Sequence, residues 1–368
     1  MSREASQKSL WLFVSDCEGP ISKNDNAFEL TAHIIPDGGS FFALVSKYDD
    51  VLADVVQKLG YKAGDTLRLI LPFLKAYGAT NKGIKKFSAQ NVLLVSGAKH
   101  TLTFVKQLMA SFIVSTSYEQ YISSLCELIG FPFKNCYCTH LNLDKYDISA
   151  KEIERLQQLQ KEIAALPMIE IPKNACSVSD FSHRDQETVE RLDTIFWKEL
   201  PKMTSGKMLT EVNPVGGTEK ARAVKEIVER MNCSLDRVMY VGDSITDAPA
   251  LKLVRENGGF AVSFNGNGYS VRESDVAVLS RDTTVTSVLA EAFSKHGKDG
   301  VFKLVEDWNP SGLKNNGVSP ELCKRMSMVF SDGFPQMEQV TERNVERLKK
   351  ESSIFRKTVR GEAIGQLG

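Results

Sequence analysis

Two short stretches of the sequence decide the expected fold: WLFVSDCEGP at residues 11–20 and VMYVGDSITD at residues 238–247. In each stretch an apolar run typical of a buried strand leads into acidic residues, beginning with Asp16 in the first and Asp243 in the second. Ligands of open parallel α/β sheets bind outside the carboxyl ends of the strands. We therefore expect both acidic ends to lie in one site.

Four carboxylates are expected to meet there: Asp16, Glu18, Asp243 and Asp247. They would repel one another unless a cation lay between them. Mg²⁺ prefers oxygen ligands and usually binds substrate phosphate as well. Any one of these acidic residues alone also fits a helix N-cap or a turn, so the prediction depends on their occurring together. The pattern predicts metal-assisted phosphoryl chemistry.

The composition limits the class of protein. A chain of 368 residues predicts about two or three domains. Its 46 basic and 46 acidic residues cancel, which argues against broad attraction to nucleic acid or anionic membrane. The apolar run at residues 10–14 is too short for a signal peptide, and no apolar stretch approaches the roughly 20 residues of a membrane span. We expect a cytoplasmic protein that binds neither membrane nor nucleic acid.

The cysteines support that expectation. There are seven, an odd number, and no C-x-x-C pair occurs among them. Free thiols in a reducing compartment are the favoured interpretation. A metal site at the pair Cys136 and Cys138 is the less favoured alternative.

Strands alternating with helices predict a parallel sheet. The expected strands lie at 11–14, 112–114, 238–241, 260–264 and 276–279, and the expected helices at 97–109, 119–129, 218–231, 247–256 and 283–293.

The remaining segments do not show this alternation of strands and helices. Residues 22–88 show helical spacing broken by Gly and Pro, which predicts a cap of short helices. Residues 141–205 predict two charged helices whose narrow apolar stripe suits a solvated hairpin. The tail has loop composition and ends in a mildly basic helix at about 337–359. The expected domains are a discontinuous α/β core (1–21, 89–140 and 206–294), a helical cap (22–88), a helical insertion (141–205) and a C-terminal extension (295–368).

Four motifs occur in order: Asp16-x-Glu18-Gly19, Ser115 after a strand, Lys220 at the start of a helix, and Gly242-Asp243-x3-Asp247. Together they resemble the haloacid dehalogenase (HAD) superfamily, and within it the phosphoserine-phosphatase-like branch. The resemblance covers about half of the chain. It implies a Rossmann-like parallel-sheet HAD core carrying the helical cap and the additional helical insertion.

The resemblance also implies roles for the acidic residues. Asp16 would be the nucleophile that attacks phosphorus and becomes an aspartyl phosphate. The Asp16 carboxylate, the main-chain carbonyl of Glu18 and the Asp243 carboxylate would bind Mg²⁺. Asp247 would support the metal directly or through water.

Phosphate would be bound by Ser115, by the Thr116 backbone N–H at a helix N-terminus, and by Lys220. Simple helix capping is the alternative for Ser115. For the cationic role, Lys207 is the rival of Lys220. The Gly-Gly turn that leads from residue 216 into a helix favours Lys220.

Glu18 departs from the common family pattern, which has Asp at this position. A Glu keeps the carboxyl group and adds a methylene, so it can still protonate a leaving group and activate water. A subgroup resembling phosphoserine phosphatase and homoserine phosphotransferase also shows Asp-x-Glu-Gly. The sequence leaves open how well water competes with another acceptor.

We therefore predict a Mg²⁺-dependent phosphatase for a small phosphomonoester, phosphoserine-like by resemblance. A cap beside the site favours a small substrate, since its closure would exclude polymers. One rival is a phosphotransferase that uses an alcohol acceptor. The other is a regulatory binding protein on the same scaffold. In either case the insertion and the last helix offer a surface for a protein partner or a second copy of the chain.

Overall fold

The computed structural model describes residues 10–367, so residues 1–9 of the expected core and residue 368 of the expected extension lie outside it. Within the described range the strands form a seven-stranded sheet of order β3-β2-β1-β4-β5-β6-β7. Neighbouring strands are parallel except for β6 and β7, which are antiparallel. The strands are β1 (Leu12–Ser15), β2 (Ala110–Tyr118), β3 (Cys136–Thr139), β4 (Val238–Gly242), β5 (Phe260–Phe264), β6 (Val276–Leu279) and β7 (Gln336–Gln339). The predicted α/β class with a Rossmann-like core is confirmed.

Both faces of the sheet are covered, which explains the continuous apolar runs of its strands. Side chains alternate between the faces. Leu12 and Val14 of β1 pack with α11 and α12, whereas Phe13 packs with α6, α7 and α14. The core helices are α6 (Ala98–Leu108), α7 (Glu119–Ile129), α11 (Thr218–Arg230), α12 (Ala248–Glu256), α13 (Gly268–Glu273) and α14 (Thr284–Glu306).

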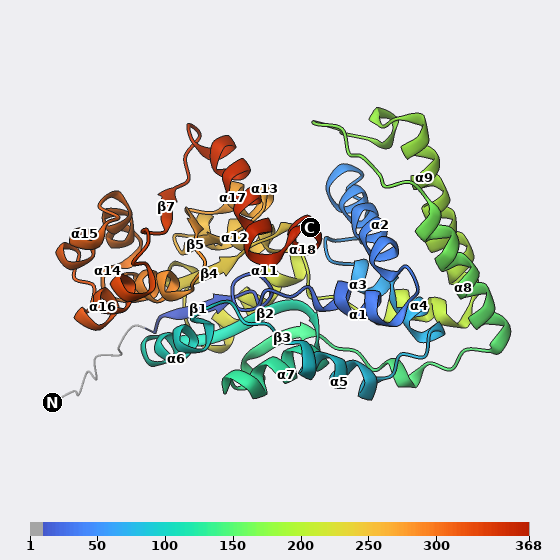
Figure 1. The fold of residues 1–368 in the computed structure, drawn as a ribbon, viewed down its shortest axis with the longest axis horizontal. Coiled ribbons are helices and arrows are strands. Elements are labelled where there is room, and N and C mark those ends of the chain that lie inside the picture. Colours follow the sequence, from blue (N-terminus) through green and yellow to red (C-terminus); the bar gives the residue numbers. More distant parts are fainter. Residues whose placement is uncertain (1–9, 368) are drawn as a thin grey trace.

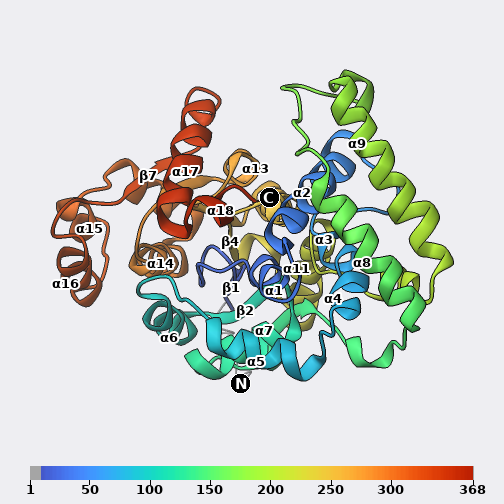
Figure 2. The same ribbon diagram turned by 45° about the vertical axis from the view of Figure 1, so that its right-hand side comes forward.

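The cap and the insertion lie together at one side of the sheet, as both views show (Figures 1 and 2). The cap contains α1 (Asn26–Ile34), α2 (Gly38–Asp50), the π-helical turn Val51–Val55, α3 (Thr66–Leu69), α4 (Leu71–Ala76) and α5 (Asn81–Asn91). The insertion contains α8 (Ala150–Ala165), α9 (His183–Thr194) and the π-helical turn Ile195–Glu199.

These two segments share one hydrophobic cluster, which corrects the expected solvated hairpin. The apolar stripe of α8 and α9 is narrow, but it packs against the cap. Its residues Leu156, Leu159 and Leu192 are completely buried there. Trp197 donates a hydrogen bond of 2.8 Å from Nε1 to the hydroxyl of Tyr48 in α2. The insertion is therefore packed as a continuation of the cap.

The expectation of a loop-rich tail is also wrong. Helix α14 continues to Glu306 through a bend at Gly297, where φ is 64° and ψ is −167°. The following elements are α15 (Pro310–Asn315), α16 (Pro320–Val329), β7, α17 (Val345–Arg360) and α18 (Glu362–Gly365). The final helix starts later than the sequence predicted because residues 336–339 pair with β6.

Helix α17 returns the chain to the carboxyl end of the sheet. Its buried side chains, Leu348, Ser352 and Arg356, are spaced by four residues and so share one face. The Ser352 hydroxyl donates a 2.6 Å hydrogen bond to the carbonyl of Gly266. Across residues 10–367, every helix is too short or too polar to cross a lipid bilayer.

Candidate active site

The first and fourth strands bring their acidic ends together. The Asp16 amide donates a 2.8 Å hydrogen bond to the Val241 carbonyl, which extends the pairing of β1 and β4 by one residue. Carboxylate oxygens of Asp16, Asp243 and Asp247 then lie within 4.8 Å of one another, and all three residues are buried. The structure thus brings together three of the four predicted carboxylates directly.

Two glycines make this approach of the chain segments feasible. Gly19 has φ of +102°, and a Cβ there would lie 2.2 Å from Oδ2 of Asp243. A Cβ on Gly242 would lie 2.6 Å from the Cβ of Asp247. Any side chain at either position would push a carboxylate out of place, so both glycines of the sequence motifs have a steric role.

Lys220 lies at the centre of the acidic group. It is completely buried in the first turn of α11, with Nζ 2.7 Å from Asp16 Oδ2 and 2.8 Å from Asp247 Oδ1. Its rival, Lys207, is exposed and lines a different pocket, beside Trp197 and Leu209. The geometry therefore favours Lys220 for the cationic role.

The carboxylate of Asp247 is fully engaged. Oδ1 accepts hydrogen bonds from Lys220 Nζ and the Tyr240 hydroxyl, both at 2.8 Å. Oδ2 accepts from the backbone amides of Asp243 at 3.0 Å and Ser244 at 3.1 Å. With the Ser244 hydroxyl, 3.3 Å from Oδ2, five donors surround a carboxylate whose usual capacity is about four. This supports an indirect role for Asp247, which orients Lys220. Sequence analysis missed Tyr240 because it lies inside an apolar strand.

Burial and charge act in opposite directions on these groups. Burial, together with the negative charge of Asp247, raises the pKa of Asp16 to about 8, although Lys220 opposes the shift. Burial also disfavours the charges of Lys220 and Asp247, but their mutual attraction outweighs it. As a result the pKa of Lys220 is raised and that of Asp247 is lowered. The ammonium group is thus firmly charged.

Glu18 points into the cavity near the start of the cap. Its Oε1 accepts a 2.7 Å hydrogen bond from the backbone amide of Asn26. Burial, and then the negative charge of Asp25, raise the pKa of Glu18 well above its usual value. These surroundings favour the protonated carboxyl group, which is the form that can donate a proton.

Ser115 lies where β2 becomes irregular. The pairing of β2 with β3 shifts register between Val114 and Tyr118, which releases the intervening residues from the ladder. Such irregularities often re-aim side chains at active sites. Ser115 Oγ donates to Ser117 Oγ and accepts from the Ser117 amide, both at 3.2 Å. It caps no helix, because α7 begins only at Glu119 and has no side-chain cap.

The expectation for Thr116 is wrong in one respect. Its backbone lies within β2, three residues before α7 begins, and not at a helix N-terminus. Its hydroxyl donates a 3.1 Å hydrogen bond to the Val215 carbonyl, next to the glycine turn that precedes Lys220. Thr116 lines the cavity, so its amide stays a predicted phosphate ligand without the help of a helix dipole.

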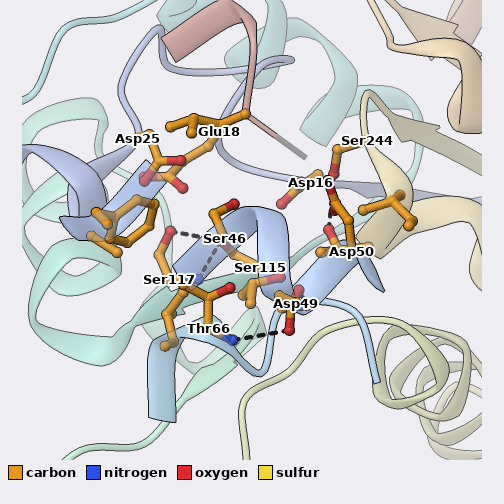
Figure 3. A pocket seen from close by; sticks show the side chains of 18 of the residues that line it. Asp16, Glu18, Asp25, Ser46, Asp49, Asp50, Thr66, Ser115, Ser117 and Ser244 are labelled. Carbon is orange, nitrogen blue, oxygen red and sulfur yellow. Dashed lines mark hydrogen bonds between the residues drawn. The ribbon is translucent and has the colours of Figure 1, made fainter. Parts of the chain in front are cut away.

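The core, the cap and the C-terminal segment enclose a cavity of about 100 Å³. In Figure 3, Glu18 and Asp25 lie together on one side, and Ser115, Thr66 and Asp49 lie on the other. On the cap side, the Asp49 carboxylate accepts hydrogen bonds from the amides of Gly64 at 2.8 Å and Thr66 at 3.1 Å. Other lining residues are Asp16, Ala27, Phe42, Ser46, Asp50, Gly64, Leu67, Thr116, Ser117, Ser244, Ile245, Thr246, Arg356, Arg360 and Leu367.

Two arginines of α17 reach this cavity, and sequence analysis missed both. Arg356 and Arg360 each direct Nη1 to Oδ2 of Asp243, the latter at 3.1 Å. Arg360 also donates from Nε to the Lys23 carbonyl at 3.1 Å and from Nη2 to the Asn24 carbonyl. In the sequence, the two arginines are recognisable only by their spacing of four residues on a basic helix. This spacing shows that they share a helix face but not what that face contacts.

The residues present fit a divalent cation. The candidate donors at Asp16 and Asp243 are all oxygen atoms, as a hard cation requires. Guanidinium groups of Arg356 and Arg360, described above, contact Oδ2 of Asp243. Positive charge thus already lies at a carboxylate that would bind the cation. The Asp243 carboxylate therefore lies in surroundings that accommodate positive charge.

Comparisons with known proteins find several similar structures. A gene product of known structure from Archaeoglobus fulgidus is 25% identical, covers 98% of this chain and 99% of its own, and superposes with a TM-score of 0.78. Phosphoserine phosphatase with bound substrate matches at 14% identity over 77% of this chain and 99% of its own, with a TM-score of 0.46. A phospho-aspartyl intermediate analogue of phosphoserine phosphatase gives the same identity and coverage, with a TM-score of 0.45. The sequence has no match among proteins of curated function.

The family model of haloacid dehalogenase-like hydrolases matches residues 65–289, well over half of the chain. The matched region contains Ser115, Lys220 and Asp243, whereas Asp16 lies before it and joins the same site through β1. With the parallel sheet and its acidic strand ends in place, the chain belongs to the haloacid dehalogenase-like hydrolases.

Proposed function

We propose that this hydrolase cleaves a small phosphomonoester in a Mg²⁺-dependent reaction, through an aspartyl phosphate on Asp16. The observation that carries the proposal is the buried ion pair between Lys220 and Asp16, the latter a residue that lines the cavity. It places the carboxyl group of the proposed nucleophile 2.7 Å from an ammonium group that can neutralise phosphate. A purely structural ion pair would not need an adjoining cavity lined by an acid such as Glu18.

In the first step, Lys220, the Ser115 hydroxyl and the Thr116 amide bind the phosphate. One oxygen of Asp16 attacks phosphorus while the bond from phosphorus to the ester oxygen breaks. Glu18 gives its proton to the departing oxygen, so the alcohol leaves in neutral form. The raised pKa of Glu18 favours the protonated state that this step needs.

In the second step, the Glu18 carboxylate takes a proton from a water molecule as the water oxygen attacks phosphorus. The bond from phosphorus to Asp16 breaks, which releases phosphate and restores both carboxyl groups. An alcohol that replaced this water would make the enzyme a phosphotransferase, which is the alternative reaction at the same site.

Asp16, the Glu18 carbonyl and Asp243 would hold Mg²⁺, and Asp247 would act through Lys220 or a bridging water. When bound, the cation neutralises phosphate oxygens and orients the line of attack. This ligand set comes from the motif resemblance and is supported by the distances among the carboxylate oxygens.

The substrate is small. A cavity of about 100 Å³ is well below the roughly 300–1,000 Å³ of ordinary ligand pockets. It has room for a phosphate group and a few further atoms. A phosphoserine-like metabolite is the first candidate, on the likeness of the Asp-x-Glu-Gly motif.

The free thiols support a location in a reducing compartment, the cytoplasm. All seven cysteines are free, and the sulfur atoms of Cys126 and Cys136 are 3.4 Å apart without a bond between them.

The test is phosphate release from a panel of small phosphomonoesters, measured with Mg²⁺ and with a chelator. We expect turnover that needs Mg²⁺ and that disappears in Asp16→Asn, which keeps the shape of the side chain but removes the nucleophilic charge. Added alcohols, followed by analysis for new phosphate esters, measure transfer. Activity of folded Asp16→Asn equal to wild type would refute the mechanism.

A further inference from the structure

The C-terminal helix α17 supplies the positive charge of the cavity lining. Among the described residues that line it, Arg356 and Arg360 are the cationic ones. Their side chains are only 3% and 5% exposed, so both charges are almost fully withdrawn from water. A buried guanidinium group needs close anionic or carbonyl partners to offset its lost hydration.

Arg356 is incompletely satisfied. Its Nη1 contacts the carboxylate of Asp243 and lies 3.1 Å from the main-chain carbonyl of the same residue. Its Nε is buried and has no hydrogen-bond partner. A buried donor without an acceptor is costly, so this group has unused binding capacity at the cavity.

Both arginines share one oxygen with the candidate cation. Oδ2 of Asp243 accepts from Arg356 and Arg360, and Asp243 is also the main metal ligand from β4 in the proposed reaction. Because like charges repel, a divalent cation held by the Asp243 carboxylate would compete with the two guanidinium groups. Guanidinium donors released in this way would remain inside the site.

Arg360 approaches the cavity from the side of Glu18, the proposed acid for the leaving group. Arg360 is fixed by the carbonyls of Lys23 and Asn24, in the turn that follows Glu18. The predicted phosphate ligands, Ser115 and Lys220, instead come from β2 and α11. In Figure 3 the C-terminal ribbon, in faint red, passes above Glu18 and not beside Ser115.

We propose that Arg356 and Arg360 bind a second anionic group on the alcohol part of the substrate, such as a carboxylate, and so determine specificity. This inference rests on the phosphatase function proposed above. The planar forks of the two side chains match the geometry of a carboxylate. Because the cation frees them from Asp243, binding of the cation and of the second anion is mutually favourable.

Matched, non-hydrolysable ligands test the proposal by binding alone. The compound 3-phosphonopropionate carries a carboxylate, and propylphosphonate has a methyl group in its place. Calorimetry in saturating Mg²⁺ should show at least about tenfold tighter binding of the carboxylate compound, since charge-assisted contacts are involved. With a chelator the preference should shrink, because the arginines then stay on Asp243.

Variants of α17 assign the effect to its source. Arg360→Gln should reduce the ratio of the two dissociation constants to near one, and Arg360→Lys should restore part of it through charge alone. Arg347→Gln is the matched control: Arg347 lies on the same helix, is 47% exposed and pairs with Glu351 at 2.8 Å. It should keep the wild-type ratio. Circular dichroism verifies that each variant is folded.

Outcomes for the inference and for the proposed function are separable. A wild-type ratio near one in Mg²⁺ overturns the inference, even if the protein hydrolyses p-nitrophenyl phosphate. A preserved ratio in folded Arg360→Gln and Arg356→Gln also overturns it. Tighter Mg²⁺ binding in these variants with no change in the ratio would show that the arginines only obstruct Asp243. A ratio that depends on the arginines supports the inference even when no ester is turned over, a result that would contradict only the phosphatase function.

Discussion

Glu18 combines a carboxyl group at the cavity with a backbone position two residues after Asp16, the proposed nucleophile. If Glu18 acts as acid and then as base, Glu18→Gln should slow the hydrolysis of an alkyl phosphate by about 10²–10⁴-fold. Hydrolysis of p-nitrophenyl phosphate should be slowed much less. The reason is that p-nitrophenolate leaves without a proton. Acid-quenched samples should contain phosphate bound to Asp16. Equal, mild losses on both substrates with no trapped phosphate would leave Glu18 with its backbone carbonyl alone.

Gly19 permits a direct test of how tightly the acidic group is arranged. An alanine there adds a Cβ that would lie 2.2 Å from Asp243 Oδ2, so Gly19→Ala should displace the carboxylate and weaken Mg²⁺ binding at least about tenfold by calorimetry. Gly60→Ala is the control. Gly60 also has positive φ, +74°, but open space around it, so it shares the backbone cost of roughly 1–2 kcal/mol without the clash. Similar Mg²⁺ affinities for the two variants would contradict the steric role.

At the site, sequence predicts the residues that follow strand ends or begin helices. Asp16 and Asp243 were found because local pattern places them at the strand ends of a parallel sheet, and Lys220 was found through the resemblance of its turn and helix to a family motif. Tyr240 and the two arginines were missed for a different reason. Their function depends on which atoms they meet across the fold, and an apolar strand or a basic helix looks the same with or without such a partner.

At the scale of the elements, the contact between the cap and the insertion leads to a prediction about stability. Gln160 of α8 is buried, donates a 2.9 Å hydrogen bond to the Pro36 carbonyl and accepts one of the same length from the Tyr77 hydroxyl. Gln160→Ala should lower the free energy of unfolding by about 1–3 kcal/mol, because two cap groups lose their partner. Urea unfolding measures this. The exposed neighbour variant Gln158→Ala should stay near wild type, and an equally small effect at Gln160 would mean that the insertion is only loosely attached.

The same elements show where sequence reasoning succeeds. Strands β5 and β6 have the predicted bounds, since a fully buried strand is a short apolar run between turns. The insertion was misjudged because a narrow stripe on a charged helix does not reveal a partner surface. The tail was misjudged because short helices such as α15 are made of turn-forming residues and depend on packing against α14 and α16.

For the whole molecule, metal binding and folding are linked. Asp16 and Asp243 come from distant parts of the chain, so a site formed by both exists only in the folded state. Mg²⁺ at about 100 times its dissociation constant should therefore stabilise the fold by about 2.7 kcal/mol, seen as a rise in Tm. The rise should vanish in Asp243→Asn and persist in Asp236→Asn, a variant of an exposed aspartate in the turn before β4. An equal rise in both would indicate general ionic effects.

The return of α17 to the sheet has a consequence for biosynthesis. About 340 positions separate Asp16 from Arg356, although both line one cavity. At the usual pace of roughly 5–20 residues per second, a ribosome needs tens of seconds to add the second after the first. Over the last 113 of these positions, from Asp243 to Arg356, the emerging chain already contains Asp16, Lys220 and Asp243 but lacks the two arginines that contact Asp243. The nascent protein therefore passes through a stage in which its acidic cluster is open to cations before α17 can dock.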